Sequence, residues 1–393
     1  MLLTKKTQQK LEQILKQAVE QGETAGISLL IQGKDGECYV QEGWADQEQN
    51  IPIERDSIFR LYSMSKPITA AAAMILMEQG KLDLGEKVSY YLPAFENQKA
   101  VVDGREIPVE NPMIVKDLLN MTSGLTYEGQ ATVTERQTGA YLEQMKQRLG
   151  TDHSVTTREA ADHLGTIPLK FLPGTSWCYS MSADVLGAVI EQASGMRFGD
   201  FLQQFLFDPL EMEDTGFWVP EEKQHRLTKV YQKNPDGKLT LYTDNHLAIQ
   251  NAMNSRPAFE SGGAGLVSTI DDYAKFARML LNGGERNGVR VMEPGTAAFF
   301  CGGRLSSSQQ NAFDDWRILN GYTYQHLMRF LEQPSRGMCL GSQGEYGWDG
   351  WLGCYFSNDP AHDMSILAMQ QIKDAGFTPV LRRVRNAIFS EIL

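Results

Sequence analysis

A serine and a lysine, three residues apart, open one of the most apolar segments of the chain. In RLYSMSKPITAAAAMILMEQG (60–80), Ser63 and Lys66 precede a run dominated by alanine, methionine, isoleucine and leucine. Pro67 suits the first turn of a helix, where its missing N–H costs little, so we expect a helix to begin here. Residues three apart lie on one face of a helix. The spacing therefore predicts that the serine hydroxyl meets the lysine amine.

Such a pair has the chemistry of an activated nucleophile. A serine hydroxyl reacts poorly until a base removes its proton. Lysine acts as that base only when neutral, and burial against apolar side chains disfavours its charged form. The S-x-x-K pattern is weak by itself, because chance gives about one match in a chain of this length. An N-cap serine beside a solvated lysine explains the pattern at least as well, so the interpretation depends on partners.

Two further segments supply candidate partners. Tyr179 lies in WCYSMSAD (177–184), just before a helix expected from about residue 182, and its hydroxyl could carry a proton to a leaving group. An ordinary half-buried tyrosine is the alternative. In EYGWDGWLGCYF (345–356), glycines stand beside an expected edge strand. Backbone N–H groups there, with that of Ser63, could form an oxyanion hole. A Gly-rich turn entering a strand is the alternative.

The elements that must position these side chains form an α+β pattern. Apolar spacing predicts amphipathic helices at 5–21 and 378–393. Strand-like runs near both ends of the chain are separated by turn residues, which predicts one antiparallel sheet built from both termini. These runs cover residues 25–32, 36–45, 350–360 and 363–372.

The middle of the chain is expected to be mainly helical. Helices that end on glycine are predicted at 67–80, 182–195 and 268–284, and loops at 95–113 and 165–176. We therefore predict a discontinuous α/β subdomain from residues 1–60 and 255–393. A mainly helical subdomain, residues 61–254, would be inserted into it, with Ser63 at the interface.

Composition narrows the possible partners and the compartment. The 393 residues carry a net charge of −12, which argues against nucleic acid and anionic membrane as partners. Five scattered cysteines without a C-x-x-C pair suggest neither a disulfide framework nor a zinc site. No leader-like h-region follows Met1, and no apolar run reaches the roughly 20 residues of a membrane span. We expect a cytoplasmic protein that acts on a small molecule; its oligomeric state stays open.

Taken in order, the segments resemble the serine β-lactamase and penicillin-binding-protein superfamily. The most similar branch is that of class C β-lactamases, D-alanyl-D-alanine carboxypeptidases and family VIII carboxylesterases. The S-x-x-K motif matches Ser63–Lys66, the second motif matches residues 179–181, and the third, of Lys-Thr-Gly type, matches residues 348–350. Connecting segments such as VKDLLNMTSGL (115–125) are similar too, and the likeness runs collinearly from about residue 10 to the end.

The resemblance implies a β-lactamase/transpeptidase-like fold and an acyl-enzyme mechanism. Ser63 would be acylated, Lys66 would be its base, and Tyr179 would assist proton transfer. The backbone N–H groups of Ser63 and Trp351 would form the oxyanion hole, and no metal or organic cofactor would be needed. The residues implied to bind substrate are Trp348, Asp349, Gly350 and Met181.

Two departures from the family motifs bear on the substrate. Met181 stands where the second motif often carries Asn, and Trp348 stands where lactamases carry Lys. A cation at position 348 would attract a carboxylate, whereas Trp offers an indole N–H and an apolar face. We therefore favour small esters or amides over β-lactams and D-Ala-D-Ala peptides. The alternatives are a β-lactamase or D-amino-acid-specific peptidase, and a non-catalytic binding protein of the same fold.

Other features of the sequence receive plainer interpretations. The six histidines form no H-E-x-x-H cluster, and neither a G-x-S-x-G elbow nor a P-loop occurs. SGGAG (261–265) is interpreted as a tight turn before a strand, and Arg60 as a site residue or a member of a structural ion pair. Five aromatic residues are candidates for an apolar acyl pocket: Tyr62, Trp177, Trp218, Tyr346 and Trp351.

Overall fold

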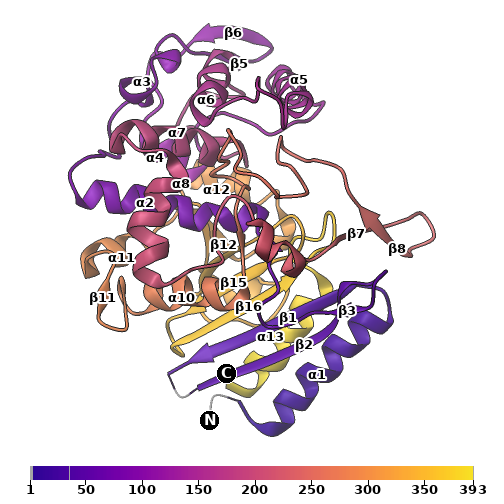
Figure 1. Cartoon of the computed structure of the whole chain (residues 1–393). Coiled ribbons are helices and arrows are strands. Elements are labelled where there is room, and N and C mark those ends of the chain that lie inside the picture. The colour runs from indigo at the N-terminus through magenta and orange to yellow at the C-terminus, as the bar shows by residue number, and fades with distance from the viewer. Residues whose placement is uncertain (1–2, 35, 393) are drawn as a thin grey trace.

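An eight-stranded antiparallel sheet is the centre of the computed structural model, which describes residues 3–34 and 36–392 (Figure 1). The strand order is β12-β13-β14-β15-β16-β1-β2-β3. In that order the strands are Tyr322–Gln325, Met328–Leu331, Tyr346–Asp349, Tyr355–Asp359, Met364–Gln370, Gly26–Gly33, Gly36–Asp46 and Ile51–Pro52.

The sheet joins the two ends of the chain, as predicted. Strand β1 pairs with β16 from Ile27 opposite Gln370 to Gly33 opposite Met364, and β1 also pairs with β2. The predicted turn between β1 and β2 includes residue 35, which lies outside the described residues. The edge position expected for β14 is wrong, because β14 lies between β13 and β15. Residues 322–331, for which no strand was predicted, form β12 and β13 beyond it.

Helices cover both faces of the sheet. Helices α1 (Lys5–Glu20) and α13 (Pro379–Ile392) pack on the face near the termini, which confirms the two predicted terminal helices (Figure 1). Alternate residues of β1, such as Ile27 and Leu29, are buried against them. Leu30, the residue after Leu29, faces the opposite core, where α2 (Ser65–Glu78) and α10 (Ile270–Leu281) lie. The period of two along a strand therefore separates two apolar cores.

The segment between β4 (Phe59–Arg60) and β9 (Val267–Ser268) is mainly helical, and its helices lie away from α1 and α13 in Figure 1. The loop expected at 95–113 contains a hairpin instead, because Gly104 with φ +75° permits a tight turn. The placement of the subdomain boundaries stays a prediction. The helices here are α3 (Val88–Tyr91), α4 (Val115–Asn120), α5 (Val133–Gln147), α6 (Thr157–Thr166), α7 (Ser182–Ser194), α8 (Phe198–Leu202) and α9 (Asp208–Leu210); the hairpins are β5 (Lys99–Val102) with β6 (Arg105–Pro108), and β7 (Val230–Lys233) with β8 (Leu239–Tyr242).

Short elements complete the C-terminal half. Helices α11 (Pro294–Phe300) and α12 (Ser307–Phe313) precede β12, and a small hairpin, β10 (Glu285–Arg286) with β11 (Val289–Arg290), follows α10. Of the helices that the structure describes, none combines the length and the apolar character that a bilayer span requires.

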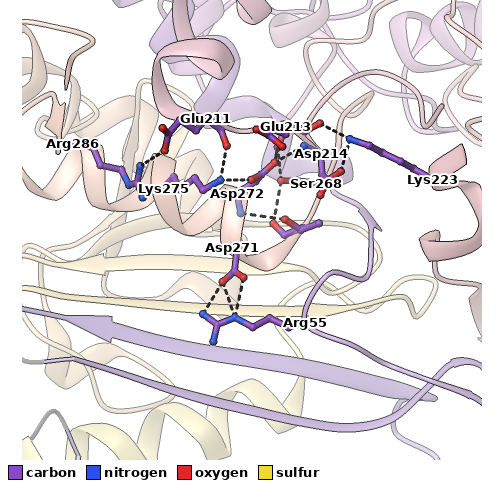
Figure 2. Close-up of polar contacts among 12 residues, drawn as sticks. Arg55, Glu211, Glu213, Asp214, Lys223, Ser268, Asp271, Asp272, Lys275 and Arg286 are labelled. Carbon is purple, nitrogen blue, oxygen red and sulfur yellow. Dashed lines mark hydrogen bonds and ion pairs between the residues drawn. The ribbon is translucent and has the colours of Figure 1, made fainter. Parts of the chain in front are cut away.

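A polar network anchors the start of α10 (Figure 2). Arg55 pairs with Asp271 at 2.9 Å and with Glu37 of β2 at 2.7 Å. The Asp272 carboxylate accepts the backbone N–H of Asp214 at 2.7 Å. Acidic side chains in a first turn also complement the helix dipole. Through Arg55, the network connects the start of α10 to β2 of the sheet.

Candidate active site

The predicted serine–lysine contact forms at the start of α2. Residues 62–64 make one 3-10 turn, and α2 continues from Ser65 with its first 12 residues buried. The Lys66 side chain is fully buried, and its Nζ lies 3.2 Å from the Oγ of Ser63, which is half-buried. Spacing along the helix thus brings the two groups together.

The turn that presents Ser63 contains a residue in an unusual conformation. Tyr62 has φ +45°, in the left-handed region that non-glycine residues seldom occupy. Its ring packs 4.9 Å from that of Trp351 and 6.0 Å from that of His246, measured between centroids. Such conformations persist where surrounding packing holds them, and they gather at functional sites.

Lys66 lies in an environment that favours a neutral amine. Its Nζ donates to the carbonyl of Gly263 at 2.8 Å and lies 3.0 Å from the hydroxyl of Tyr127. Burial lowers the pKa of Lys66 to about 7, although the carboxylates of Asp184 and Asp349 act in the opposite direction. At neutral pH a large fraction of this lysine is therefore able to accept a proton.

The loop at 261–265 supports Lys66 as well as turning the chain. The Gly263 N–H donates to Asp184 Oδ1 at 3.1 Å, and the Ser261 hydroxyl donates to the same oxygen. A Cβ at Gly263 would stand 2.5 Å from Asp184 Oδ2, so only glycine fits. Burial raises the pKa of Asp184, while the charge of Lys66 lowers it. Asp184, at the start of α7, thus holds the carbonyl that binds the lysine.

Tyr179 faces Ser63 and Lys66, as the second motif predicts. Lys66 Nζ lies 4.6 Å from the centroid of its ring. The indole N–H of Trp348 donates to the Tyr179 hydroxyl at 3.1 Å. Burial raises the pKa of Tyr179, whereas hydrogen bonds with Ser63 and Trp348 oppose this rise. Tyr179 is therefore protonated at neutral pH and has a proton to donate.

The third motif lies against the turn that carries Ser63. Strand β14 ends at Asp349, and the N–H of Gly350 donates to the Cys354 carbonyl at 2.7 Å. A Cβ at Gly350 would collide with the carbonyl of Leu61, so glycine is required where the two segments meet. Asp349 pairs with buried Arg329 at 2.6 Å. Burial raises the pKa of Asp349, and the charge of Arg329 opposes that rise.

These segments enclose a cavity of about 360 Å³ above Ser63. All but one of the implied substrate-binding residues line it. The exception is Met181, which is 1% exposed and belongs to the core below the cavity. The lining consists of Tyr62, Ser63, Tyr127, Glu128, Tyr179, His246, Leu247, Trp316, Trp348, Asp349, Gly350, Trp351, Asp374 and Gly376.

The remaining candidates take different places. Of the five aromatic residues proposed for an acyl pocket, Tyr62 and Trp351 line the cavity, and Trp177 is buried in the core. Tyr346 is also in the core, and Trp218 is partly exposed and outside the lining. Arg60 was predicted to be a site residue or a member of an ion pair. Its guanidinium instead donates to the backbone carbonyls of Asn251 and Thr228, the latter at 2.7 Å.

Several residues that line the cavity were not predicted from the sequence. Tyr127 follows the recognised segment 115–125 by two residues, which was the one available signal. His246, Trp316 and Asp374 lie in loops without a periodic pattern of apolar residues, so only folding brings them to the cavity above Ser63. Nowhere in the described part of the chain do three or more His, Cys, Asp or Glu side chains gather as they would around a metal ion.

Comparison with known proteins places the chain in a family. A family model described as Beta-lactamase matches residues 11–387. Protein Rv1367c of Mycobacterium tuberculosis is 29% identical over 367 residues, covering 91% of this chain and 88% of that protein. Esterase EstB of Burkholderia gladioli is 28% identical over 403 residues, covering 97% and 95%.

Solved structures agree with this assignment. EstCE1, described as a hydrolase with promiscuous acyltransferase activity, superposes with a TM-score of 0.80 at 26% identity, over 98% of both chains. A penicillin-binding protein homologue from Pyrococcus abyssi shares the fold, with a TM-score of 0.70 over 98% of this chain and 76% of its own at 20% identity. With a family model matching nearly the whole chain and a shared fold, this protein belongs to the beta-lactamase family.

Proposed function

We propose that the protein is a serine hydrolase that cleaves small carboxylic esters through an acyl-enzyme on Ser63. The observation that carries this proposal is the buried Lys66 amine, 3.2 Å from the serine hydroxyl and with a pKa lowered to about 7. A neutral amine has two N–H donors and one lone pair. Gly263 and Tyr127 offer oxygens to the donors, which leaves the lone pair to receive the Ser63 proton.

Acylation then follows from these positions. Ser63 Oγ bonds to the carbonyl carbon of the ester as its proton moves to Lys66 Nζ. The backbone N–H groups of Ser63 and Trp351 stabilise the negative oxygen of the tetrahedral intermediate. As the bond to the alcohol oxygen breaks, Tyr179 donates its proton to that oxygen and recovers one from Lys66, which becomes neutral again.

Deacylation reverses the roles. A water molecule loses a proton to Lys66 as its oxygen bonds to the acyl carbon. The bond to Ser63 Oγ breaks, and the serine oxygen takes the proton held by Lys66, so the enzyme returns to its starting state. An alcohol in place of water would give acyl transfer to a new ester. EstB is named an esterase and EstCE1 is described with acyltransferase activity, which supports ester chemistry for this chain.

Trp348 makes esters better candidates than β-lactams. Its indole occupies the position where a lysine would bind a carboxylate, and it is committed to the Tyr179 hydroxyl at 3.1 Å. Met181 is buried and offers no amide to a substrate. A penicillin carboxylate would therefore meet no complementary cation from either motif.

A substrate panel tests the proposal. The protein is treated with a serine-reactive phosphonate, p-nitrophenyl butyrate and a chromogenic cephalosporin, and the adduct is mapped by peptide mass spectrometry. We expect one phosphonate on Ser63 and faster turnover of the ester than of the cephalosporin. Faster cephalosporin turnover would support the lactamase alternative, and absence of any adduct would support the non-catalytic one.

The pH dependence of ester hydrolysis should report on Lys66. The amine is active only when unprotonated, so kcat/KM should fall about tenfold per pH unit below its pKa of about 7 and level off above it. Tyr179 has a raised pKa and should add no alkaline limb within the ordinary tyrosine range. Initial rates read at the isosbestic wavelength of nitrophenol measure this profile. A limb whose apparent pKa lies in the ordinary carboxyl range would instead indicate that a carboxylate is the general base.

Removing the Asp184 charge should move that limb in a known direction. The carboxylate favours protonated Lys66, so Asp184→Asn should lower the lysine pKa and shift the acid limb to lower pH by roughly half a unit to one unit. Asp236→Asn, in an exposed turn, is the control and should leave the limb in place. A shift to higher pH in Asp184→Asn would contradict the assigned electrostatics.

Trp348→Phe should weaken the proton donor without removing the ring. Loss of the indole N–H removes a hydrogen bond to the Tyr179 hydroxyl. A net contribution of about 1 kcal/mol corresponds to a decrease of roughly fivefold in kcat. Trp218→Phe, on the partly exposed Trp218, is the matched control. Steady-state kinetics on p-nitrophenyl butyrate distinguish the two, and equal kcat values in both variants would remove Trp348 from the proton path.

A further inference from the structure

The side chains that line the cavity above Ser63 include several carboxylates. Three acidic residues, Glu128, Asp349 and Asp374, line it, and within residues 3–34 and 36–392 no lysine or arginine does so. The remaining titratable base of the lining is His246, and burial lowers its pKa to about 4. At neutral pH this histidine is uncharged, so the charge of the cavity surface is negative.

Two of these three carboxylates, Glu128 and Asp374, face neutral groups, whereas the third, Asp349, has a cationic partner. Asp349 is neutralised by buried Arg329 at 2.6 Å. Glu128, which is exposed, faces His246 Nδ1 at 4.0 Å, and that ring is neutral at physiological pH. Asp374 is also exposed and accepts the indole N–H of Trp351 at 2.6 Å, a neutral donor.

Two lysines influence His246 from outside the lining. Lys146 and Lys373 lower its pKa through their charges. Lys146 is paired with Glu143 at 3.7 Å, and Lys373 Nζ lies 5.2 Å from the centroid of the Tyr242 ring. Because neither side chain reaches the cavity surface, neither offers a direct contact to a bound anion.

Aromatic faces lie between the two exposed carboxylates. The rings of His246 and Trp351 stack with centroids 4.0 Å apart and an angle of 26° between their planes. Tyr62 packs on the same indole at 4.9 Å. Aromatic faces attract ammonium groups through their quadrupoles, and nearby carboxylates add to this attraction. We call these five residues, Tyr62, Glu128, His246, Trp351 and Asp374, the acidic aromatic wall.

We propose that the substrate of this hydrolase carries a cationic ammonium group that binds at the acidic aromatic wall. The inference rests on the ester hydrolysis proposed above and names the class of ester. Trp351 connects catalysis with ammonium binding, because its backbone N–H is proposed for the oxyanion hole and its indole belongs to the wall. An ammonium group held there lies within the same cavity as Ser63, and a carboxylate at that position would be repelled.

Charged esters and their neutral isosteres test this directly. Butyrylcholine is compared with 3,3-dimethylbutyl butyrate, which replaces the trimethylammonium group by a tert-butyl group of the same shape. The p-nitrophenyl esters of 4-(trimethylammonio)butyrate and 5,5-dimethylhexanoate place the same difference in the acyl half. In at least one pair we expect kcat/KM to be about tenfold higher for the cationic member at low salt, and the ratio to decrease as salt rises.

The double variant Glu128→Gln/Asp374→Asn isolates the wall. We expect its ratio of cationic to neutral kcat/KM to fall to within about twofold of unity. The control, Glu12→Gln/Asp236→Asn, removes the same net charge from exposed positions outside the cavity and should keep the wild-type ratio. Because only ratios within one protein are compared, a general change in activity does not affect the result.

The possible failures are distinguishable. Equal kcat/KM within both pairs, or a preference that persists in the double variant, would overturn the cationic substrate while leaving ester hydrolysis intact. A binding measurement adds a readout without turnover: choline should protect Ser63 from the phosphonate better than 3,3-dimethylbutanol does. Equal protection would also overturn the inference. Absence of both labelling and turnover would overturn the proposed function, and this inference with it.

Discussion

Ser63→Ala is expected to lower kcat for p-nitrophenyl butyrate by about 10⁴- to 10⁶-fold. The variant keeps the proposed oxyanion hole and the cavity but has no oxygen to form the acyl-enzyme. It should also take up no phosphonate at this position. Because Ser63 is half-buried and lies in a single 3-10 turn, alanine should leave the thermal unfolding midpoint close to that of the wild type. Intact mass and stopped-assay kinetics measure both effects.

Ser65→Ala is a demanding control for this experiment. Ser65 lies two residues away, fully buried, and its hydroxyl accepts the N–H of Leu266 at 3.1 Å. Its removal leaves a buried donor without that partner, at a cost of about 1–3 kcal/mol in stability. We expect Ser65→Ala to melt earlier and still be labelled on Ser63. Labelling that survives in Ser63→Ala, or disappears only in Ser65→Ala, would reject Ser63 as the nucleophile.

Lys66→Met is expected to lower the rate of acylation by about 10³- to 10⁴-fold, the upper part of the range for loss of a general base. Methionine has a similar unbranched shape and suits the apolar surroundings of α2, so the fold should be retained. The residual rate should also lose its acid limb near the lysine pKa of about 7, because the titrating group is gone. Phosphonate labelling followed by mass spectrometry over time measures acylation, and circular dichroism checks the fold.

A surface lysine provides the comparison. Lys99→Met removes an exposed lysine that pairs with Glu106 at 3.4 Å, and it should change neither acylation nor the pH profile. Exposed ion pairs contribute little to stability, so its melting point should also stay the same. If Lys66→Met were acylated as fast as Lys99→Met, the base would have to be another group, and Tyr179 would be the next to test.

Local periodicity was sufficient for much of the fold. The terminal helices and the strands at 25–45 carry clear apolar patterns, and the predicted pairing of both chain ends is confirmed as β1 beside β16. The prediction was wrong where the chain lacks such a pattern. Strands β12 (YTYQ) and β13 (MRFL) are four residues long, too short for their alternation to stand out, and missing them placed β14 at an edge. The hairpin at 99–108 was assigned as loop because turn residues dominate that region.

For the candidate site, too, local spacing predicted some contacts and could not predict others. Ser63 and Lys66 were predictable because one helix turn brings them together, and this geometry needs no other part of the chain. Tyr179 and residues 348–350 were placed by motif resemblance, and the structure positions them around the same cavity. Met181, implied by the same resemblance, is instead in the core, because the chain turns into α7 at that residue.

The family, the antiparallel sheet and the serine–lysine pair could be predicted without a structure, since these depend on local spacing and collinear motifs. The surroundings that favour neutral Lys66, and the groups that the cavity presents to a substrate, became visible in the folded chain. Burial of Lys66 lowers its pKa, and the carbonyl that binds its amine belongs to Gly263, about 200 residues away along the chain. Glu128, His246 and Asp374 reach the cavity from three separate loops. Charge and desolvation depend on distances in space, which spacing along a chain does not encode.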